Sequence, residues 1–111
     1  MKNYMVLYHA PAEAFAGIAD MTEEQKIEGM KPWMDWKESF GDAIVDFGSP
    51  LMMGKTVLPD GGSAESIRQV AGYSILRAGN IDEAQQLLQG HPHLAWHGGC
   101  EIEVHEMAPM M

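Results

Sequence analysis

Histidine is the residue type in this chain that is best suited to binding metal or moving protons. Four of the five histidines lie between residues 91 and 105. Imidazole binds zinc, copper and nickel, and it changes its charge close to neutral pH. The run HPHLAWH at 91–97 is therefore a candidate metal site. Its spacing, however, matches neither a zinc finger nor a helical H-E-x-x-H site. We predict instead that His91 and Pro92 mark the end of a helix and that no metal is bound.

Acid–base chemistry needs a titratable side chain and a partner that orients it. His9, Asp46 and His105 lie in segments whose composition predicts strands, and Glu103 precedes His105 by two residues. Residues two apart on a strand point to the same side, and a nearby carboxylate favours the charged form of an imidazole. We predict His9 and Asp46 as a catalytic or ligand-orienting set, with His93 and His105 as further candidates. A salt bridge between subunits is the structural alternative.

Two other groups of residues give weaker chemical signals. Trp33, Trp36 and Trp96, together with ten methionines, are able to line an apolar pocket. The helical spacing of Trp33 and Trp36 favours a role in the core instead. Cys100 has no basic neighbour in sequence that would activate its thiol, so a nucleophilic role is unsupported.

Charge and cysteine content exclude several classes of protein. The formal net charge is −9, from 16 acidic and 7 basic residues. A field of this sign repels phosphate backbones and anionic lipid surfaces, so we predict neither a nucleic-acid nor a membrane partner. The single cysteine forms no intrachain disulfide and indicates a reducing compartment. With no signal sequence and no long apolar run, we predict a cytoplasmic protein.

Length and apolar patterning indicate one domain, residues 1–111, with four strands. The last strand alternates most clearly, with Ile102 and Val104 on one side and acidic residues on the other. The residues between the second and third strands are rich in Gly, Pro, Ser and Asp, which predicts a long loop with a short strand near 55–58. The four predicted strands cover residues 3–9, 43–48, 70–77 and 100–107.

Local signals define two helices. Thr22 and Gln25 form a capping box before a helix that ends at Gly41. Pro32 removes a backbone donor in this stretch, which predicts a kink or a separate short turn. Asn80 caps a second, shorter helix. The apolar stripe of the first helix consists of Ile27, Met30, Trp33, Met34, Trp36 and Phe40.

The element order βαββαβ predicts the fold class. Two helices covering one face of a four-stranded antiparallel sheet form a ferredoxin-like α+β sandwich. The other sheet face is left bare, and we predict that a second subunit covers it and forms an interface or a cleft. Strict alternation places Asp46, Glu103 and His105 on this face beside Ile44.

Several segments resemble the YCII-related family, which includes the DGPF-type proteins, over residues 2–109. The most specific part combines GYSIL, GHPHL and IEVHE, and the earlier stretch GDAIVDFGSPL adds to it. The resemblance implies a ferredoxin-like fold that dimerises into an α/β barrel. It also implies that some members are small enzymes with a His–Asp pair in a cleft, and that one branch is a dehydrochlorinase acting on a chlorinated aromatic.

This chain departs from the family's His–Asp pair. Matching the family proline to Pro32 places Met34 at the histidine position, and residues 22–40 contain no histidine. We therefore predict a homodimer that performs acid–base chemistry on a small organic molecule, without a cofactor or a metal. Its site would be a cleft at the dimer sheet face, built from His9, Asp46, His93 and His105. The alternative is a non-catalytic module that binds a small ligand or a partner.

Overall fold

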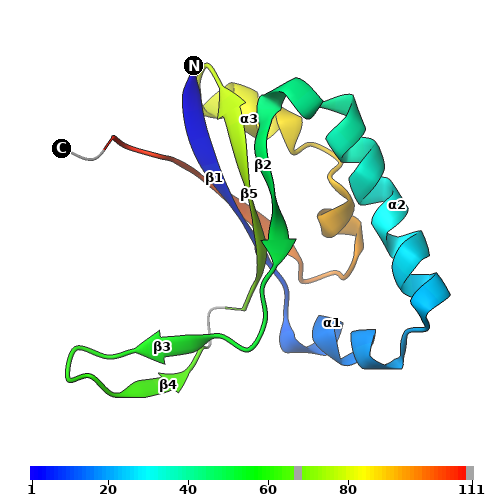
Figure 1. Ribbon diagram of the computed structural model, residues 1–111, viewed down its shortest axis with the longest axis vertical. Helices are drawn as coiled ribbons and strands as arrows, with labels where there is room; N and C mark the ends of the chain where they lie inside the picture. Colours follow the sequence, from blue (N-terminus) through cyan, green and yellow to red (C-terminus); the bar gives the residue numbers. More distant parts are fainter. Residues whose placement is uncertain (67–68, 110–111) are drawn as a thin grey trace.

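The computed structural model describes residues 1–66 and 69–109 and has a four-stranded antiparallel sheet at its centre (Figure 1). The strand order is β2-β5-β1-β6, so the last long strand, β6, is an edge strand that pairs with the first, β1. This is the order that a ferredoxin-like βαββαβ chain produces, and the α+β prediction is confirmed. The long strands are β1 (Lys2–His9), β2 (Ile44–Pro50), β5 (Val70–Ala78) and β6 (Glu101–Glu106).

The helices lie on one side of the sheet (Figure 1). The long helix α2 (Glu23–Ser39) and the shorter α3 (Ile81–Leu87) follow β1 and β5 in the chain. No helix among the described residues is long and apolar enough to cross a membrane. The remaining helical turns are α1 (Ala12–Ala16), η1 (Ile18–Asp20), η2 (Gly41–Ala43) and η3 (Pro92–Ala95).

The predicted capping box starts α2. Thr22 Oγ1 accepts a hydrogen bond of 3.1 Å from the Gln25 amide, and Gln25 Oε1 accepts one of 2.9 Å from the Thr22 amide. The helix continues through Pro32 as one element, so a separate turn before it is not formed. Asn80 caps α3 as predicted, because its Oδ1 accepts from the Glu83 amide at 2.9 Å.

The core lies between the sheet and the two main helices. Tyr4, Val6 and Tyr8 of β1 point toward the helices and are buried. Trp36 of α2 packs in one cluster with Val6 and Tyr8, and its Nε1 donates a hydrogen bond of 2.9 Å to the Leu87 carbonyl, which ties α2 to α3. The helix buries fewer apolar side chains than the predicted apolar stripe contains. Its exposed members are Ile27, Met30, Met34 and Phe40.

The opposite side of the sheet carries no helix, and we call it the bare face. In β6 the predicted alternation holds, since Ile102 and Val104 pack toward the core. In β2 it fails: the register shifts between Ile44 and Asp46, so Ile44 joins the core while Asp46 lies opposite Ile75. Such a bulge changes which side the following residues face. The bare face consists of Asn3, Met5, Leu7, His9, Asp46, Tyr73, Ile75, Arg77, Glu101, Glu103 and His105.

Residues 52–66 form an arm that extends from one end of the sheet. The predicted short strand is present as β3 (Lys55–Val57), and it pairs with β4 (Ser63–Glu65), which the sequence did not indicate. Figure 1 shows the arm pointing away from the helix layer. The radius of gyration is 15.4 Å, whereas a compact domain of this length has about 13 Å. The projecting arm accounts for this difference.

Candidate functional site

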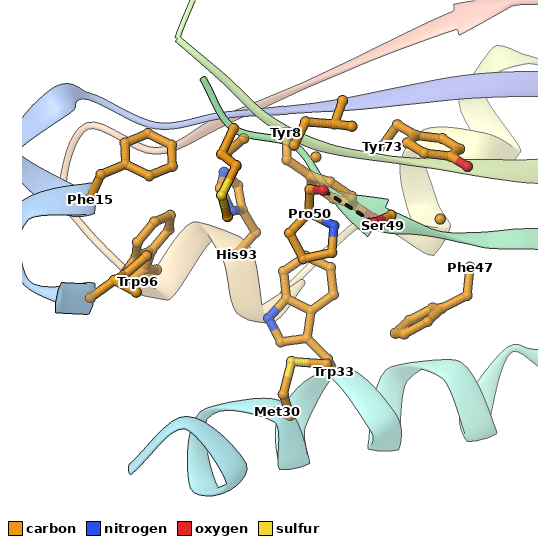
Figure 2. A pocket seen from close by; sticks show the side chains of 16 residues that line it. Tyr8, Phe15, Met30, Trp33, Phe47, Ser49, Pro50, Tyr73, His93 and Trp96 are labelled. Atoms are coloured by element: carbon orange, nitrogen blue, oxygen red, sulfur yellow. Dashed lines mark hydrogen bonds between the residues drawn. The ribbon is translucent and has the colours of Figure 1, made fainter. Parts of the chain in front are cut away.

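A cavity of about 230 Å³ opens between the sheet and α2, close to η3 (Figure 2). Its walls are almost entirely aromatic and aliphatic side chains. Trp33 and Met30 rise from α2 toward the sheet, and Phe15 and Trp96 lie together at one end. The remaining side-chain walls are Tyr8, Ile18, Phe47, Pro50, Leu51, Met52, Ala71 and His93.

Edge-to-face packing holds the aromatic walls in place. The rings of Tyr8 and Trp33 have centroids 5.0 Å apart and planes at 75°, and those of Phe15 and Trp96 are 5.6 Å apart at 87°. Such pairs are favourable because the positive ring edge meets the negative ring face. Tyr8 belongs to β1 and Trp33 to α2, so the cavity is built across the layers of the fold.

A chain of polar groups lies behind the aromatic wall. Tyr8 Oη is 2.8 Å from Ser74 Oγ, and Ser74 Oγ donates to the Phe47 carbonyl at 2.6 Å. His91 Nε2 is 3.4 Å from Tyr8 Oη, and His91 Nδ1 accepts from the His93 amide at 3.0 Å. His91 therefore carries its proton on Nε2, and the donors run in one direction from His91 through Tyr8 and Ser74 to Phe47.

The two titratable groups of this hydrogen-bonded chain, His91 and Tyr8, are uncharged at neutral pH. Burial lowers the pKa of His91 to about 4, with a smaller contribution from His93. Burial also raises the pKa of Tyr8 to about 12, although the hydrogen bond with Ser74 acts in the opposite direction. These groups stabilise the interior as neutral hydrogen-bonding partners and are poorly suited to exchange protons with a ligand at neutral pH.

His93 is the predicted site residue that borders the cavity. Its side chain is 2% exposed, and Nε2 lies 2.8 Å from the His9 carbonyl. Burial lowers the pKa of His93, so the ring is held neutral. Its Nε2 proton is already donated to the His9 carbonyl. By contrast, the indole nitrogen of Trp33 has no acceptor among the described residues, and it points toward the end of the cavity where Trp96 lies (Figure 2).

A second polar group lies on the bare face. Glu103 Oε1 is 2.5 Å from His9 Nε2, and Glu103 Oε2 is 3.0 Å from His105 Nε2. The hydrogen bond from His105 and the nearby charge of His9 lower the pKa of the Glu103 carboxyl. One carboxylate thus bridges two imidazoles, and the predicted pairing of Glu103 with His105 is present.

Asp46 stands apart from these histidines. Its carboxylate accepts from the Gly48 amide at 2.8 Å and from the Tyr73 hydroxyl at 3.3 Å. Asp46 belongs to β2 and His105 to β6, which are the two edges of the sheet. The structure therefore brings His9 and His105 together through Glu103. Asp46 lies on the opposite edge strand, and the His93 ring meets His9 at the backbone carbonyl.

The histidine run at 91–97 has a different role from the predicted one. The helix α3 ends at Leu87, and His91 is instead the N-cap of η3, with Pro92 at the first helical position. His97 Nδ1 accepts from the Gly99 amide at 3.1 Å. Within residues 1–66 and 69–109, no group of three or more His, Cys, Asp or Glu side chains has the arrangement needed to hold a metal ion.

Sequence reasoning missed the centre of the cavity. Trp33 and Trp96 line it, as one interpretation of the tryptophans allowed, while Trp36 is in the core. The available signal was Ser74, a polar residue on the helix-facing side of β5 where the pattern calls for an apolar one. A buried hydroxyl requires a partner, and that requirement points to Tyr8.

The fold and the cavity define an α+β protein with a ferredoxin-like sheet and a ligand-sized apolar pocket beneath its long helix. Residues 1–108 match the YCII-related domain, so the chain belongs to the YCII-related family that its motifs resemble. A comparison with curated proteins finds no match.

Proposed function

We propose that this protein binds a small, flat, mostly apolar organic molecule that carries one hydrogen-bond acceptor. The observation that carries this proposal is the composition of the cavity. Aromatic rings surround it, and its buried polar groups are neutral and already hydrogen-bonded to one another. The free indole proton of Trp33 supplies a single donor. A charged ligand would lose its hydration in such a site without compensation.

The size of the cavity narrows the ligand class. A dry cavity of about 150 Å³ is enough to bind benzene. At about 230 Å³, the cavity has room for one substituted ring or two fused rings. A phenol or a fused aromatic alcohol combines this size with one oxygen acceptor for Trp33.

Titration with 2-naphthol tests the proposal, with 2-naphthoate as the charged counterpart of the same shape. Tryptophan fluorescence and calorimetry should show binding of 2-naphthol and much weaker binding of 2-naphthoate. Trp33→Phe keeps an aromatic ring but removes the donor, and a lost hydrogen bond of about 1 kcal/mol lowers the affinity by about fivefold. Equal affinity for the two probes would contradict the proposal.

A filling substitution gives an independent check on where the probe binds. Ala71 lines the cavity from β5, so Ala71→Leu should reduce the affinity for 2-naphthol strongly. Ala108→Leu makes the same change at an exposed position outside the cavity and is the matched control. Similar affinity in both variants would place the probe elsewhere.

A second candidate function is acid–base chemistry on a small organic molecule in a cleft at the bare face. Glu103 holds the imidazoles of His9 and His105 together, which supports a site that moves a proton or binds an anion. NMR separates the candidates through the ring resonances of the histidines. A probe in the cavity shifts the signals of His93, whereas 2-naphthoate on the bare face shifts those of His9 and His105.

We also propose that the bare face forms a homodimer. Its middle is apolar and half-buried, with Met5, Leu7 and Ile75. Register places Asp46, Ile75, Met5 and His105 in one row, with the acidic and basic side chains at opposite edges. A two-fold axis parallel to the strands would set Asp46 of one copy over His105 of the other.

The single cysteine supports a reducing compartment such as the cytoplasm.

Sedimentation velocity tests the dimer. The wild type should sediment as a dimer at micromolar concentration, and Ile75→Lys should convert it to a monomer by placing a charge in the apolar centre. Ile27→Lys introduces the same charge on the exposed side of α2 and should leave the dimer intact. A wild-type protein that stays monomeric at these concentrations would contradict the dimer.

A further inference from the structure

The β3–β4 arm projects from the sheet, and within the part of the chain that the structure describes its strands contact mainly each other. Its strands have three residues each. The salt bridge between Lys55 and Glu65 is exposed, and such pairs contribute little to stability. An isolated two-stranded hairpin is marginally stable in water. The arm therefore needs a further surface to hold it in a fixed position.

The arm also exposes large apolar side chains. Met52, Met53 and Val57 are 74%, 89% and 77% exposed, and they lie close together in sequence at the start of the arm. Grouped exposed apolar residues mark surfaces that contact a partner. A phosphate or lipid-headgroup partner is disfavoured because the net charge of the chain is −9.

Two residues near the base of the arm, one inside it and one just before β5, have unusual backbone angles. Met53 and Gln69 have φ values of 56°, in the left-handed region that residues other than glycine rarely occupy. Such a conformation costs about 1 kcal/mol or more per residue. It persists where surrounding contacts determine the chain direction, so the direction of the arm is a specified feature.

We propose that the arm of one copy packs against a second copy of this chain that is seated on the bare face. The inference rests on the homodimer proposed above and extends it to a second surface. Figure 1 shows the arm reaching past the sheet on the side away from the helices, which is the side of the bare face. A body placed on that face lies beside the arm, and two-fold symmetry makes each arm clasp the other copy.

The area that a stable dimer requires supports the same partner. The four long strands have six to nine residues and are about 25 Å long on average, so at a spacing of about 4.8 Å they present a flat face of roughly 500 Å². A stable interface buries about 800 Å² on each partner. The flat area of the bare face is smaller than this, and the exposed apolar side chains of the arm are placed to add to the contact.

A charged substitution on the arm tests the clasp. Val57→Asp should raise the dimer dissociation constant at least about tenfold in sedimentation equilibrium, because it would bury an unpaired carboxylate. The control is Ile27→Asp, which changes a 62% exposed side chain on α2 and should leave the constant unchanged. A dimer of unchanged affinity in Val57→Asp would overturn the role of the arm while leaving the bare-face dimer intact. A monomeric wild type would overturn both.

Hydrogen exchange tests the same inference without any substitution. Amides of 55–57 and 63–65 should exchange more slowly at concentrations where the dimer forms than after dilution to monomer. Amides of α3 are the internal reference, since α3 lies on the helix side of the sheet. Arm amides that exchange at one rate across the whole dissociation range would show that the second copy does not contact the arm.

Discussion

The hydroxyl of Tyr8 lies 2.8 Å from Ser74 Oγ and joins β1 to β5 behind the wall of the cavity. Ser74 in turn donates to the Phe47 carbonyl, which belongs to the part of β2 where the register with β5 shifts. Phe47 has no partner residue in that register, so the serine hydroxyl replaces a ladder hydrogen bond. The Tyr8–Ser74 pair thus links three strands at the place where the edge strand is least regular.

Tyr8→Phe should destabilise the protein by about 1–3 kcal/mol, because the change leaves His91 Nε2 buried without an acceptor. The free energy of unfolding in urea measures this effect. Tyr73→Phe is the matched control: its hydroxyl is on the bare face, 3.3 Å from Asp46, and its loss should change stability by less than about 0.5 kcal/mol. Equal losses of unfolding free energy in the two variants would show that the buried hydrogen-bond network stabilises the protein no more than the exposed hydrogen bond of Tyr73 does.

Stability should fall as the pH is lowered through the range set by His91. The folded-state pKa of His91 is about 4, below its ordinary value of 6.5, so the unfolded chain takes up the proton first. The loss begins as the pH falls through about 6.5 and is complete below about 4. At 1.36 kcal/mol per unit it amounts to roughly 3 kcal/mol, and the lowered pKa of His93 acts in the same direction.

Replacing His91 separates its contribution from those of other groups. His91→Asn keeps an oxygen that is able to cap η3 but removes the titrating ring. Urea unfolding at a series of pH values should then show a shallower fall in stability between pH 6.5 and 4 than in the wild type. An unchanged slope would assign the acid sensitivity to other side chains.

The parts of the fold that the sequence predicts are those that depend on local signals. Thr22 with Gln25, and Asn80 with Glu83, form their caps within four residues of chain, and each cap is present as predicted. Alternation in β6 also needs no knowledge of other strands. These features follow from backbone hydrogen bonding and side-chain periodicity alone.

The parts that were missed depend on contacts between distant residues. The bulge that moves Ile44 into the core is set by the pairing of β2 with β5, which strict alternation cannot anticipate. The cavity likewise joins Tyr8, Trp33 and Trp96, which no motif connects. His9 and Asp46 were paired by chemical type, whereas strand order sets them on separate strands with different partners.

Gly48 gives a direct test of the bulge. Its φ is +85°, and a Cβ added there would lie 1.7 Å from the Tyr73 carbonyl oxygen, so Gly48→Ala should move the edge strand and destabilise the fold strongly. Gly29→Ala is the opposite case, because a Cβ there meets nothing within 4 Å. In this helical position alanine should stabilise by about 0.5–1 kcal/mol. Thermal unfolding should therefore separate the two variants in opposite directions.

The carboxyl of Glu103 provides a test of the cluster on the bare face. Because its folded-state pKa is lowered, the cluster stabilises the protein above the ordinary pKa of a glutamate and loses this contribution as the pH falls. His105→Gln removes the largest cause, so the pKa of Glu103, followed by NMR of the labelled carboxyl carbon, should rise. Lys2→Gln is the control, since Lys2 pairs with Glu106 rather than Glu103. A Glu103 pKa that stays the same in His105→Gln would mean that these two side chains do not interact in solution, and the cluster would then reduce to the pair of His9 and Glu103.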